Sequence, residues 1–139
     1  MYMSDSEETL GKKSDISVLI VEDDKFLRGL IGEKLRKEHY TVFEAIDGKE
    51  GLEKIKSEKP TIVLLDLVIP ETDGFEFLRI IAEDKEVNAT PIIVLSNLGS
   101  KEDIERARSL GAKDFLVKAN YTPSEIIAEI KKIISEVYL

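Results

Sequence analysis

The feature that most constrains the fold of this chain is a set of four short apolar runs, each followed directly by a polar residue. The runs are Val18–Val21, Ile62–Leu65, Ile92–Leu95 and Phe115–Val117. Their residues are continuously apolar rather than alternating with polar ones. This is typical of strands buried on both faces in a parallel sheet that helices cover on both sides. We therefore expect an α/β protein.

Helical periodicity fills the segments between these runs. Apolar residues recur at the spacing of one helix face in three places: Leu27, Leu30, Ile31 and Leu35; Phe75, Leu78, Ile81 and Ala82; and Ile126, Ile127, Ile130, Ile133, Ile134 and Val137. Such a stripe predicts an amphipathic helix packed on a core. The mixed run 40–45 suits an outer strand, which an Asp47-Gly48 turn would close.

Capping signals mark where two of the expected helices begin and where one ends. Thr122, Pro123 and Glu125 have the spacing of an N-cap, a first helical residue and a capping box. Ser100 is a weaker start signal for the fourth helix, and Gly111 suits the left-handed cap that would end it. The pattern predicts five βα units in order. Right-handed crossovers would wind them into an open sheet with helices on both faces.

Size and composition restrict the function classes. The 139 residues suit one domain, and the absence of cysteine excludes disulfides, thiol catalysis and thiolate metal sites. A net charge of −8 without a basic cluster argues against direct nucleic-acid binding. No apolar run approaches the length of a membrane span, and the polar start lacks a signal peptide. We expect a cytoplasmic protein with a flexible leader over residues 1–15.

Polar residues at the ends of the runs predict the site. In open α/β sheets, ligands bind at the carboxyl ends of the strands. Glu22 and Asp23 follow the first run, and Asp66 follows the second. Three carboxylates this close would raise one another's pKa unless a cation intervened, and Mg²⁺ prefers oxygen ligands of this kind. We expect a metal site there, with the backbone carbonyl of Val68 as a further ligand.

The acidic residues also have a simpler interpretation, because carboxylates favour the positive N-terminal end of a helix. For Asp24 we prefer this capping role. For Glu22 and Asp23 we prefer metal binding, because Asp66 should lie beside them on the adjacent strand.

Asp66, Ser96 and Lys118 complete a group suited to phosphoryl transfer. A carboxylate beside a metal can attack phosphorus and form an acyl phosphate. Ser96 follows the third run and Lys118 follows the fourth, so both should lie at the same sheet edge. An ammonium can neutralise phosphoryl oxygens, and a hydroxyl can donate a hydrogen bond to one of them.

With these residues in this order, the segment 16–139 resembles the receiver domain of two-component response regulators, in particular the stand-alone chemotaxis regulators. The matching residues are Glu22-Asp23, Asp66, Ser96 and Lys118, and the stretch Asp66–Gly74 is similar to the family's phosphorylation loop. The resemblance implies a flavodoxin-like (βα)5 sandwich with a five-stranded parallel sheet in the order 2-1-3-4-5.

The resemblance also implies a Mg²⁺-dependent switch rather than an enzyme with turnover of its own. A histidine kinase or phosphotransfer protein would supply the phosphoryl group to Asp66. Ser96 would then move toward the phosphate, and Phe115 would turn inward. These movements would alter the face formed by the fourth helix, fifth strand and fifth helix for a downstream partner. The protein would be a monomer or a phosphorylation-dependent homodimer that contacts neither nucleic acid nor membrane.

Three residues depart from the family's pattern. Ala119 follows the lysine where a proline, often with a cis bond, is usual; Asn97 follows the switch hydroxyl where a small residue is usual; and the switch aromatic Phe115 lacks a tyrosine hydroxyl. A non-proline cis bond costs about 2.5–4 kcal/mol, so the bond before Ala119 would be trans or strained. These departures bear on rate and signal strength rather than on the chemistry itself.

Two other functions compete with the switch. A receiver-like scaffold would bind partners without phosphorylation, and Ala119 and Asn97 motivate it. A phosphatase of the haloacid dehalogenase type would need a second aspartate two residues after Asp66, where this chain has Val68. Because the chain ends just after the fifth expected helix, we expect a stand-alone receiver without an output domain.

Overall fold

A parallel five-stranded sheet forms the middle layer of the protein, with strand order β2-β1-β3-β4-β5. The structure, a computed structural model, describes residues 15–138, so nearly all of the expected leader lies outside the described residues. The strands are β1 Ser17–Val21, β2 Thr41–Ala45, β3 Ile62–Leu65, β4 Ile92–Ser96 and β5 Asp114–Val117. Every strand pair is parallel, and the predicted α/β class and strand order are confirmed.

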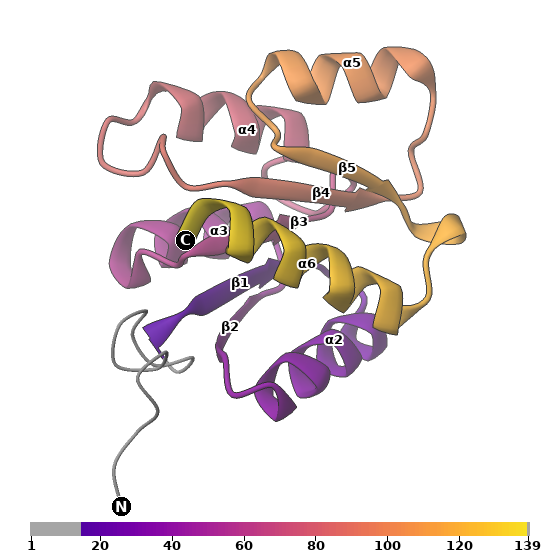
Figure 1. Ribbon diagram of the computed structural model, residues 1–139. Coiled ribbons are helices and arrows are strands. Elements are labelled where there is room, and N and C mark those ends of the chain that lie inside the picture. The colour runs from indigo at the N-terminus through magenta and orange to yellow at the C-terminus, as the bar shows by residue number, and fades with distance from the viewer. Residues whose placement is uncertain (1–14, 139) are drawn as a thin grey trace, which may run out of the picture.

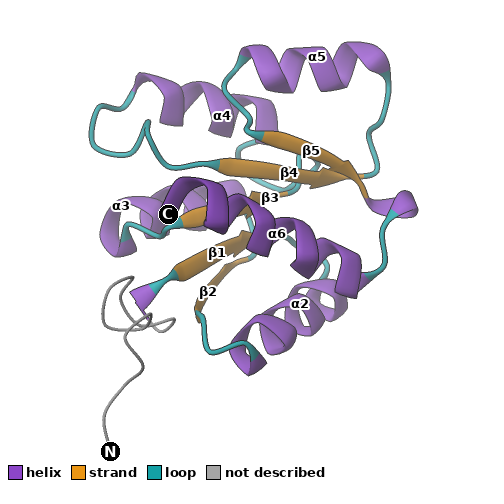
Figure 2. Ribbon diagram, viewed as in Figure 1, coloured by secondary structure: helices purple, strands orange, loops and turns teal. Residues whose placement is uncertain are grey.

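Helices cover both faces of this sheet (Figure 1, Figure 2). The five helices that follow the strands are α2 Lys25–Lys37, α3 Gly48–Glu58, α4 Gly74–Glu83, α5 Lys101–Ser109 and α6 Pro123–Tyr138. The fourth and fifth helices expected from the sequence are therefore α5 and α6. None of the helices within residues 15–138 combines the length and the apolar composition that a bilayer span needs.

Alternate residues of the strands supply two separate cores. Val18 and Ile20 of β1 pack with residues of α2 and α6, whereas Leu19 and Val21 pack with residues of α3, α4 and α5. Side chains of a strand point alternately to its two faces, so a strand covered on both faces has to be apolar throughout. This explains why the four runs are continuous and why the polar residues that follow them come at the strand ends.

Helix caps form at the three places that the sequence predicted. The Ser100 hydroxyl accepts a hydrogen bond from the Asp103 N–H at 3.1 Å. Thr122 and Glu125 form a reciprocal capping box, with N···O distances of 2.8 and 3.2 Å. Gly111 follows α5 with φ of +104°, a conformation that glycine adopts without steric cost. The caps at both ends of α5 and at the start of α6 are thus confirmed.

The predicted Asp47-Gly48 turn is wrong. β2 ends at Ala45, Asp47 is the N-cap of α3, and Gly48 is the first residue of that helix. The Asp47 carboxylate accepts a hydrogen bond from the Glu50 N–H at 2.8 Å. Asp-Gly is a strong turn signal between two strands, but here the next element is a helix, whose free N–H groups the same carboxylate satisfies.

Candidate functional site

The carboxyl ends of the central strands bring the expected acidic residues together. Val21 pairs in register with Leu65, so Glu22 and Asp66 leave two adjacent strands at the same level. Carboxylate oxygens of Glu22, Asp23 and Asp66 all lie within 4.8 Å of one another. Glu22 and Asp66 are buried, at 3% and 6% exposure, whereas Asp23 faces solvent. Two buried carboxylates and one exposed carboxylate therefore form a cluster that is open to solvent at Asp23.

Lys118 joins this cluster from the end of β5. Its ammonium lies 2.6 Å from Glu22 Oε1 and 3.0 Å from Asp66 Oδ2, so it bridges two of the three carboxylates. The apolar strand residues before Lys118 fix the direction from which its side chain enters. With only 17% of that side chain exposed, water screens these ion pairs weakly.

The surroundings change the pKa values of two of these groups. Burial, with the charge of Asp66 adding to it, raises the pKa of Glu22 from 4.5 to about 6, although Lys118 and the Asp24 N–H oppose the shift. Burial by itself would lower the pKa of Lys118, but the hydrogen bonds and charges of Glu22 and Asp66 outweigh it and raise that pKa. The lysine therefore stays charged, while Glu22 is protonated more readily than an ordinary glutamate.

These donors fit a magnesium ion. Mg²⁺ takes oxygen ligands and usually keeps several waters, so one open-sided group of carboxylates is the kind of site it uses. The donor atoms are suitable because three carboxylates lie together and two of them are buried, while the single ammonium of Lys118 pairs with only Glu22 and Asp66. Asp24 lies outside the group, because its carboxylate caps α2 by accepting a hydrogen bond from Leu27 N–H at 3.1 Å.

The loop after Asp66 approaches the carboxylate through its backbone. The Val68 N–H donates to Asp66 Oδ1 at 3.2 Å, and the Val68 side chain is 59% exposed. The Gly74 N–H donates to the Leu67 carbonyl at 2.9 Å. A Cβ on Gly74 would lie 2.4 Å from Leu67 Cα and 2.9 Å from the Asp66 carbonyl oxygen, so only glycine fits there. The role of the Val68 carbonyl as a metal ligand stays a prediction.

Ser96 and Phe115, the two expected switch residues, are not members of the acidic cluster. Ser96 is fully buried at the end of β4, and its hydroxyl accepts a hydrogen bond from the Leu98 N–H at 3.3 Å. Within residues 15–138, no hydrogen bond joins Ser96 to Asp66 or Lys118. Phe115 is 8% exposed and packs in the core on the side of α3, α4 and α5. The aromatic ring is therefore already inward in this structure.

The two other departures from the expected pattern lie at the surface. Lys118–Asn120 form a 3-10 turn, and the bond between Lys118 and Ala119 is trans. Ala119 and Asn97 are both exposed. The Lys118 side chain nevertheless reaches Asp66.

Arg28 contacts the acidic segment and was not among the site residues predicted from the sequence. The Arg28 Nη1 donates to the Glu22 carbonyl oxygen at 2.8 Å, and its Nε donates to Glu44 Oε1 at 3.0 Å. An arginine one turn after a helix N-cap can reach back to the strand end, and that spacing was the available signal. Its partner Glu44 comes from β2, which no local pattern connects to α2.

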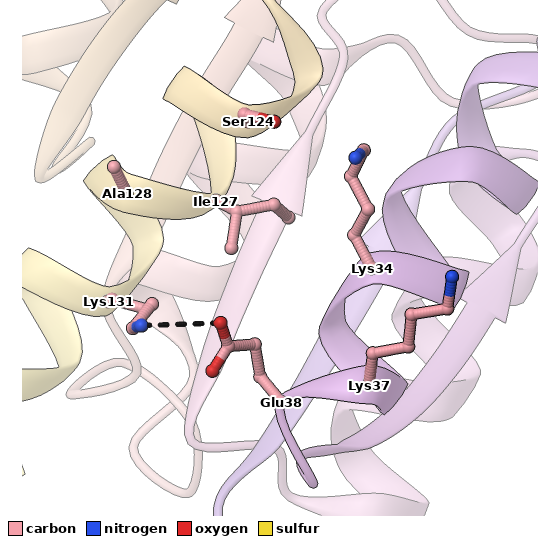
Figure 3. A pocket seen from close by; sticks show the side chains of 7 residues that line it. All are labelled: Lys34, Lys37, Glu38, Ser124, Ile127, Ala128 and Lys131. Atoms are coloured by element: carbon pink, nitrogen blue, oxygen red, sulfur yellow. Dashed lines mark hydrogen bonds and ion pairs between the residues drawn. The ribbon is translucent and has the colours of Figure 1, made fainter.

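A separate groove of about 400 Å³ lies between α2 and α6 (Figure 3). Three of the seven residues that line it are lysines, and one of them, Lys131, pairs with Glu38 at 3.4 Å. The residues that line it are Lys34, Lys37, Glu38, Ser124, Ile127, Ala128 and Lys131. None of them belongs to the acidic cluster, so this groove is not part of the candidate site.

Comparison with known proteins agrees with this geometry. Residues 18–131 match the family model described as response regulator receiver domain. The chain is 34% identical over 124 residues to protein-glutamate methylesterase/protein-glutamine glutaminase 1 of Myxococcus xanthus, covering 88% of this chain and 35% of that protein. It is 32% identical to transcriptional regulatory protein ResD of Bacillus subtilis, covering 90% of this chain and 50% of that protein. The chain thus spans between about a third and a half of these curated relatives.

Solved structures show the same likeness. The receiver domain of the Francisella response regulator 1452 matches with a TM-score of 0.79 and 29% identity, covering 87% of this chain and 98% of that one. Chemotaxis response regulator CheY4 of Vibrio cholerae matches with a TM-score of 0.78 and 27% identity, covering 85% and 98%. On the evidence of its strand order, its acidic edge and these matches, the chain belongs to the family of response regulator receiver domains.

Proposed function

We propose that this protein is a phosphoryl-accepting switch of two-component signalling, with Asp66 as the acceptor. The observation that carries the proposal is the position of the Asp66 carboxylate. It is buried, held by Lys118 at 3.0 Å, and has oxygens of Glu22 and Asp23 within 4.8 Å. An ordinary aspartate at a strand end would have neither the buried ammonium nor the two neighbouring carboxylates.

The proposed reaction transfers one phosphoryl group. An Asp66 carboxylate oxygen attacks the phosphorus of a phosphohistidine, the P–N bond breaks, and the imidazole leaves with its electron pair. Water later hydrolyses the resulting acyl phosphate, which returns Asp66 to a carboxylate and releases inorganic phosphate. The donor would be a histidine kinase or a phosphotransfer protein.

Each residue of the site has a role in this proposal. Glu22 and Asp23, with Asp66 and the Val68 carbonyl, would hold Mg²⁺, which when bound supplies positive charge for the phosphoryl oxygens. Lys118 would supply a further positive charge beside the Asp66 carboxylate, which it already contacts. Stabilising the charge of the transferred group is most of the catalytic work in phosphoryl transfer.

The signal would leave through the face formed by α5, β5 and α6. Ser96 would turn its hydroxyl from Leu98 N–H toward the phosphoryl group, and Phe115 would keep the inward position. Both residues lie at or next to the β4–β5 pair, where Ser96 pairs in register with Val117. We propose that the protein has no turnover of an external substrate and acts in the cytoplasm through a protein partner.

Intact mass spectrometry after incubation with acetyl phosphate tests the proposal. We expect a gain of one phosphoryl group by the wild type with Mg²⁺, and no gain without Mg²⁺ or in Asp66→Ala. Phosphotransfer from a phosphorylated histidine kinase to the protein is measured as well, as a second test with a protein donor. If neither donor modifies the protein and no Mg²⁺ binds, the protein is a scaffold that signals by contact alone; sustained hydrolysis of a small phosphate ester would instead indicate a phosphatase.

A further inference from the structure

The main chain of Glu22 is fixed on both sides. Its N–H donates to the Ala45 carbonyl oxygen of β2 at 3.0 Å, and its own carbonyl accepts from Arg28 at 2.8 Å. The peptide between Glu22 and Asp23 is planar, so fixing the Glu22 carbonyl also fixes the direction in which the chain enters Asp23. The Asp24 N–H then donates to Glu22 Oε2 at 3.1 Å.

The Asp23 side chain has no comparable support of its own. Among residues 15–138, no hydrogen bond or ion pair holds its carboxylate, and the residue is exposed. Yet one of its oxygens lies within 4.8 Å of oxygens of Glu22 and Asp66. The placement of Asp23 therefore depends on the backbone on either side of it.

Arg28 connects this backbone to the edge strand. Its guanidinium donates in two directions, from Nη1 to the Glu22 carbonyl and from Nε to Glu44 Oε1 at 3.0 Å. Only 12% of the Arg28 side chain is exposed. A planar guanidinium offers several donors in fixed directions, whereas an ammonium is a compact point charge, so the two are not interchangeable at such a position.

Glu44 is held in turn from its other oxygen. Arg36 Nη2 lies 3.0 Å from Glu44 Oε2, so the two arginines of α2 share one carboxylate of β2. Arg36 is half-exposed and does not contact the Glu22 segment. The chain of contacts therefore runs from Glu44 through Arg28 to the backbone before Asp23, with Arg36 as a branch.

From these contacts we infer that Arg28, oriented by Glu44, is a positioning residue that holds the Glu22-Asp23 segment where its carboxylates can share a cation with Asp66. The inference rests on the proposed function, because it assigns a task to Arg28 within the same metal site. The inference adds Arg28 of α2 and Glu44 of β2 to the residues that support the metal site, although neither is a member of the acidic cluster.

Magnesium affinity measured by isothermal titration calorimetry tests the inference. Replacing groups that orient metal ligands typically costs 10–100-fold in affinity. We expect Arg28→Gln to weaken Mg²⁺ binding about tenfold and Glu44→Gln to weaken it in the same direction. The matched control is Arg79→Gln, which removes a half-exposed arginine of α4 that pairs with Glu76 and Glu83, and it should bind Mg²⁺ like the wild type. Wild-type affinity in Arg28→Gln would overturn the inference.

Arg28→Lys separates position from charge. It keeps the positive charge but not the two-directional fork, so we expect it to bind Mg²⁺ as weakly as Arg28→Gln does. Wild-type affinity in Arg28→Lys would show that charge alone matters and would overturn the inference. If Arg28→Gln does not fold, the Mg²⁺ affinities of Arg28→Lys and Glu44→Gln, compared with that of Arg79→Gln, decide the question.

Amide hydrogen exchange in the metal-free protein distinguishes this inference from the proposed function. We expect the Asp24 amide, which donates to Glu22 Oε2 at 3.1 Å, to exchange faster in Arg28→Gln than in the wild type, while the amides in the middle of β1 stay protected. Unchanged exchange at Asp24 would overturn the positioning role. Failure of the wild type to bind Mg²⁺, with exchange altered as expected, would instead count against the proposed metal site.

Discussion

The ammonium of Lys118 lies 3.0 Å from the Asp66 carboxylate, although 52 residues separate them in the chain. The contact exists because β3 and β5 flank β4 in a parallel sheet and therefore end at the same edge. Since the same ammonium also contacts Glu22, one cation connects the ends of three strands. Replacing this lysine should therefore alter the electrostatic surroundings of both Glu22 and Asp66.

Replacement of Lys118 should impair phosphoryl acceptance more than metal binding. We expect Lys118→Met to gain phosphoryl from acetyl phosphate at least about tenfold more slowly than the wild type, because one positive group facing the phosphoryl oxygens is lost. The measurement is intact mass against time in excess Mg²⁺. Lys131→Met, which removes an exposed lysine of α6, is the control. Equal rates in wild type and Lys118→Met would contradict the role.

Replacement of Gly74 should disturb the loop beside Asp66. A Cβ at this position would lie 2.4 Å from Leu67 Cα. Because this atom belongs to the backbone, it cannot move away by a change of side-chain rotamer. We expect Gly74→Ala to lower the free energy of unfolding by about 1–3 kcal/mol, as overpacking does. Denaturant unfolding measures the change.

Gly29→Ala is the matched control for that substitution. Gly29 lies in α2 with nothing within 4 Å of an added Cβ. Alanine is favoured over glycine in a helix by about 1 kcal/mol, so this variant should be more stable than the wild type. A stable Gly74→Ala with unchanged phosphoryl acceptance would show that the loop can move without cost.

The raised pKa of Glu22 should give the metal-free protein a pH-dependent stability. Between about 4.5, its ordinary pKa, and about 6, its pKa in the fold, the folded state binds more protons than the unfolded state. The free energy of unfolding should therefore fall as pH rises through this window, by about 2 kcal/mol at most from this group.

Glu22→Gln isolates this contribution, because it removes one titrating group and leaves the others. We expect the stability of Glu22→Gln relative to the wild type to increase as pH rises from 4.5 to 6, measured by denaturant unfolding without metal. With Mg²⁺ present, the difference in stability between the two proteins should vary less with pH, since a bound cation favours the ionised carboxylate of Glu22. A difference that does not vary with pH would show that Glu22 titrates normally.

Loss of the capping box should weaken the start of α6 without affecting the acidic edge. The Thr122 hydroxyl accepts from the Glu125 N–H at 3.2 Å. We expect Thr122→Ala to lower the free energy of unfolding by about 1 kcal/mol, the usual effect of removing an N-cap. Mg²⁺ affinity should stay that of the wild type, and a marked loss of affinity would show coupling between this cap and the site.

Local sequence patterns determined the elements of this fold. Continuous apolar runs such as Ile62–Leu65 predict strands buried on both faces, and the structure confirms them. The caps at Ser100 and Thr122 are also local, because the side chain and the N–H it accepts from lie three residues apart. Asp47 shows the limit of such signals: an Asp-Gly pair suits both a turn and a helix start, and only the element that follows decides.

The sequence by itself determined which residues end the strands, and so which chemical groups could meet: carboxylates at 22, 23 and 66, a hydroxyl at 96 and an ammonium at 118. Only the tertiary structure decided how they meet. It directs Lys118 to both Glu22 and Asp66, and leaves the Ser96 hydroxyl accepting from its own loop. It also brings Arg28 between Glu44 and the Glu22 carbonyl. The physical reason is that these contacts depend on strand register and on burial, which arise from residues distant in the chain and have no local signature.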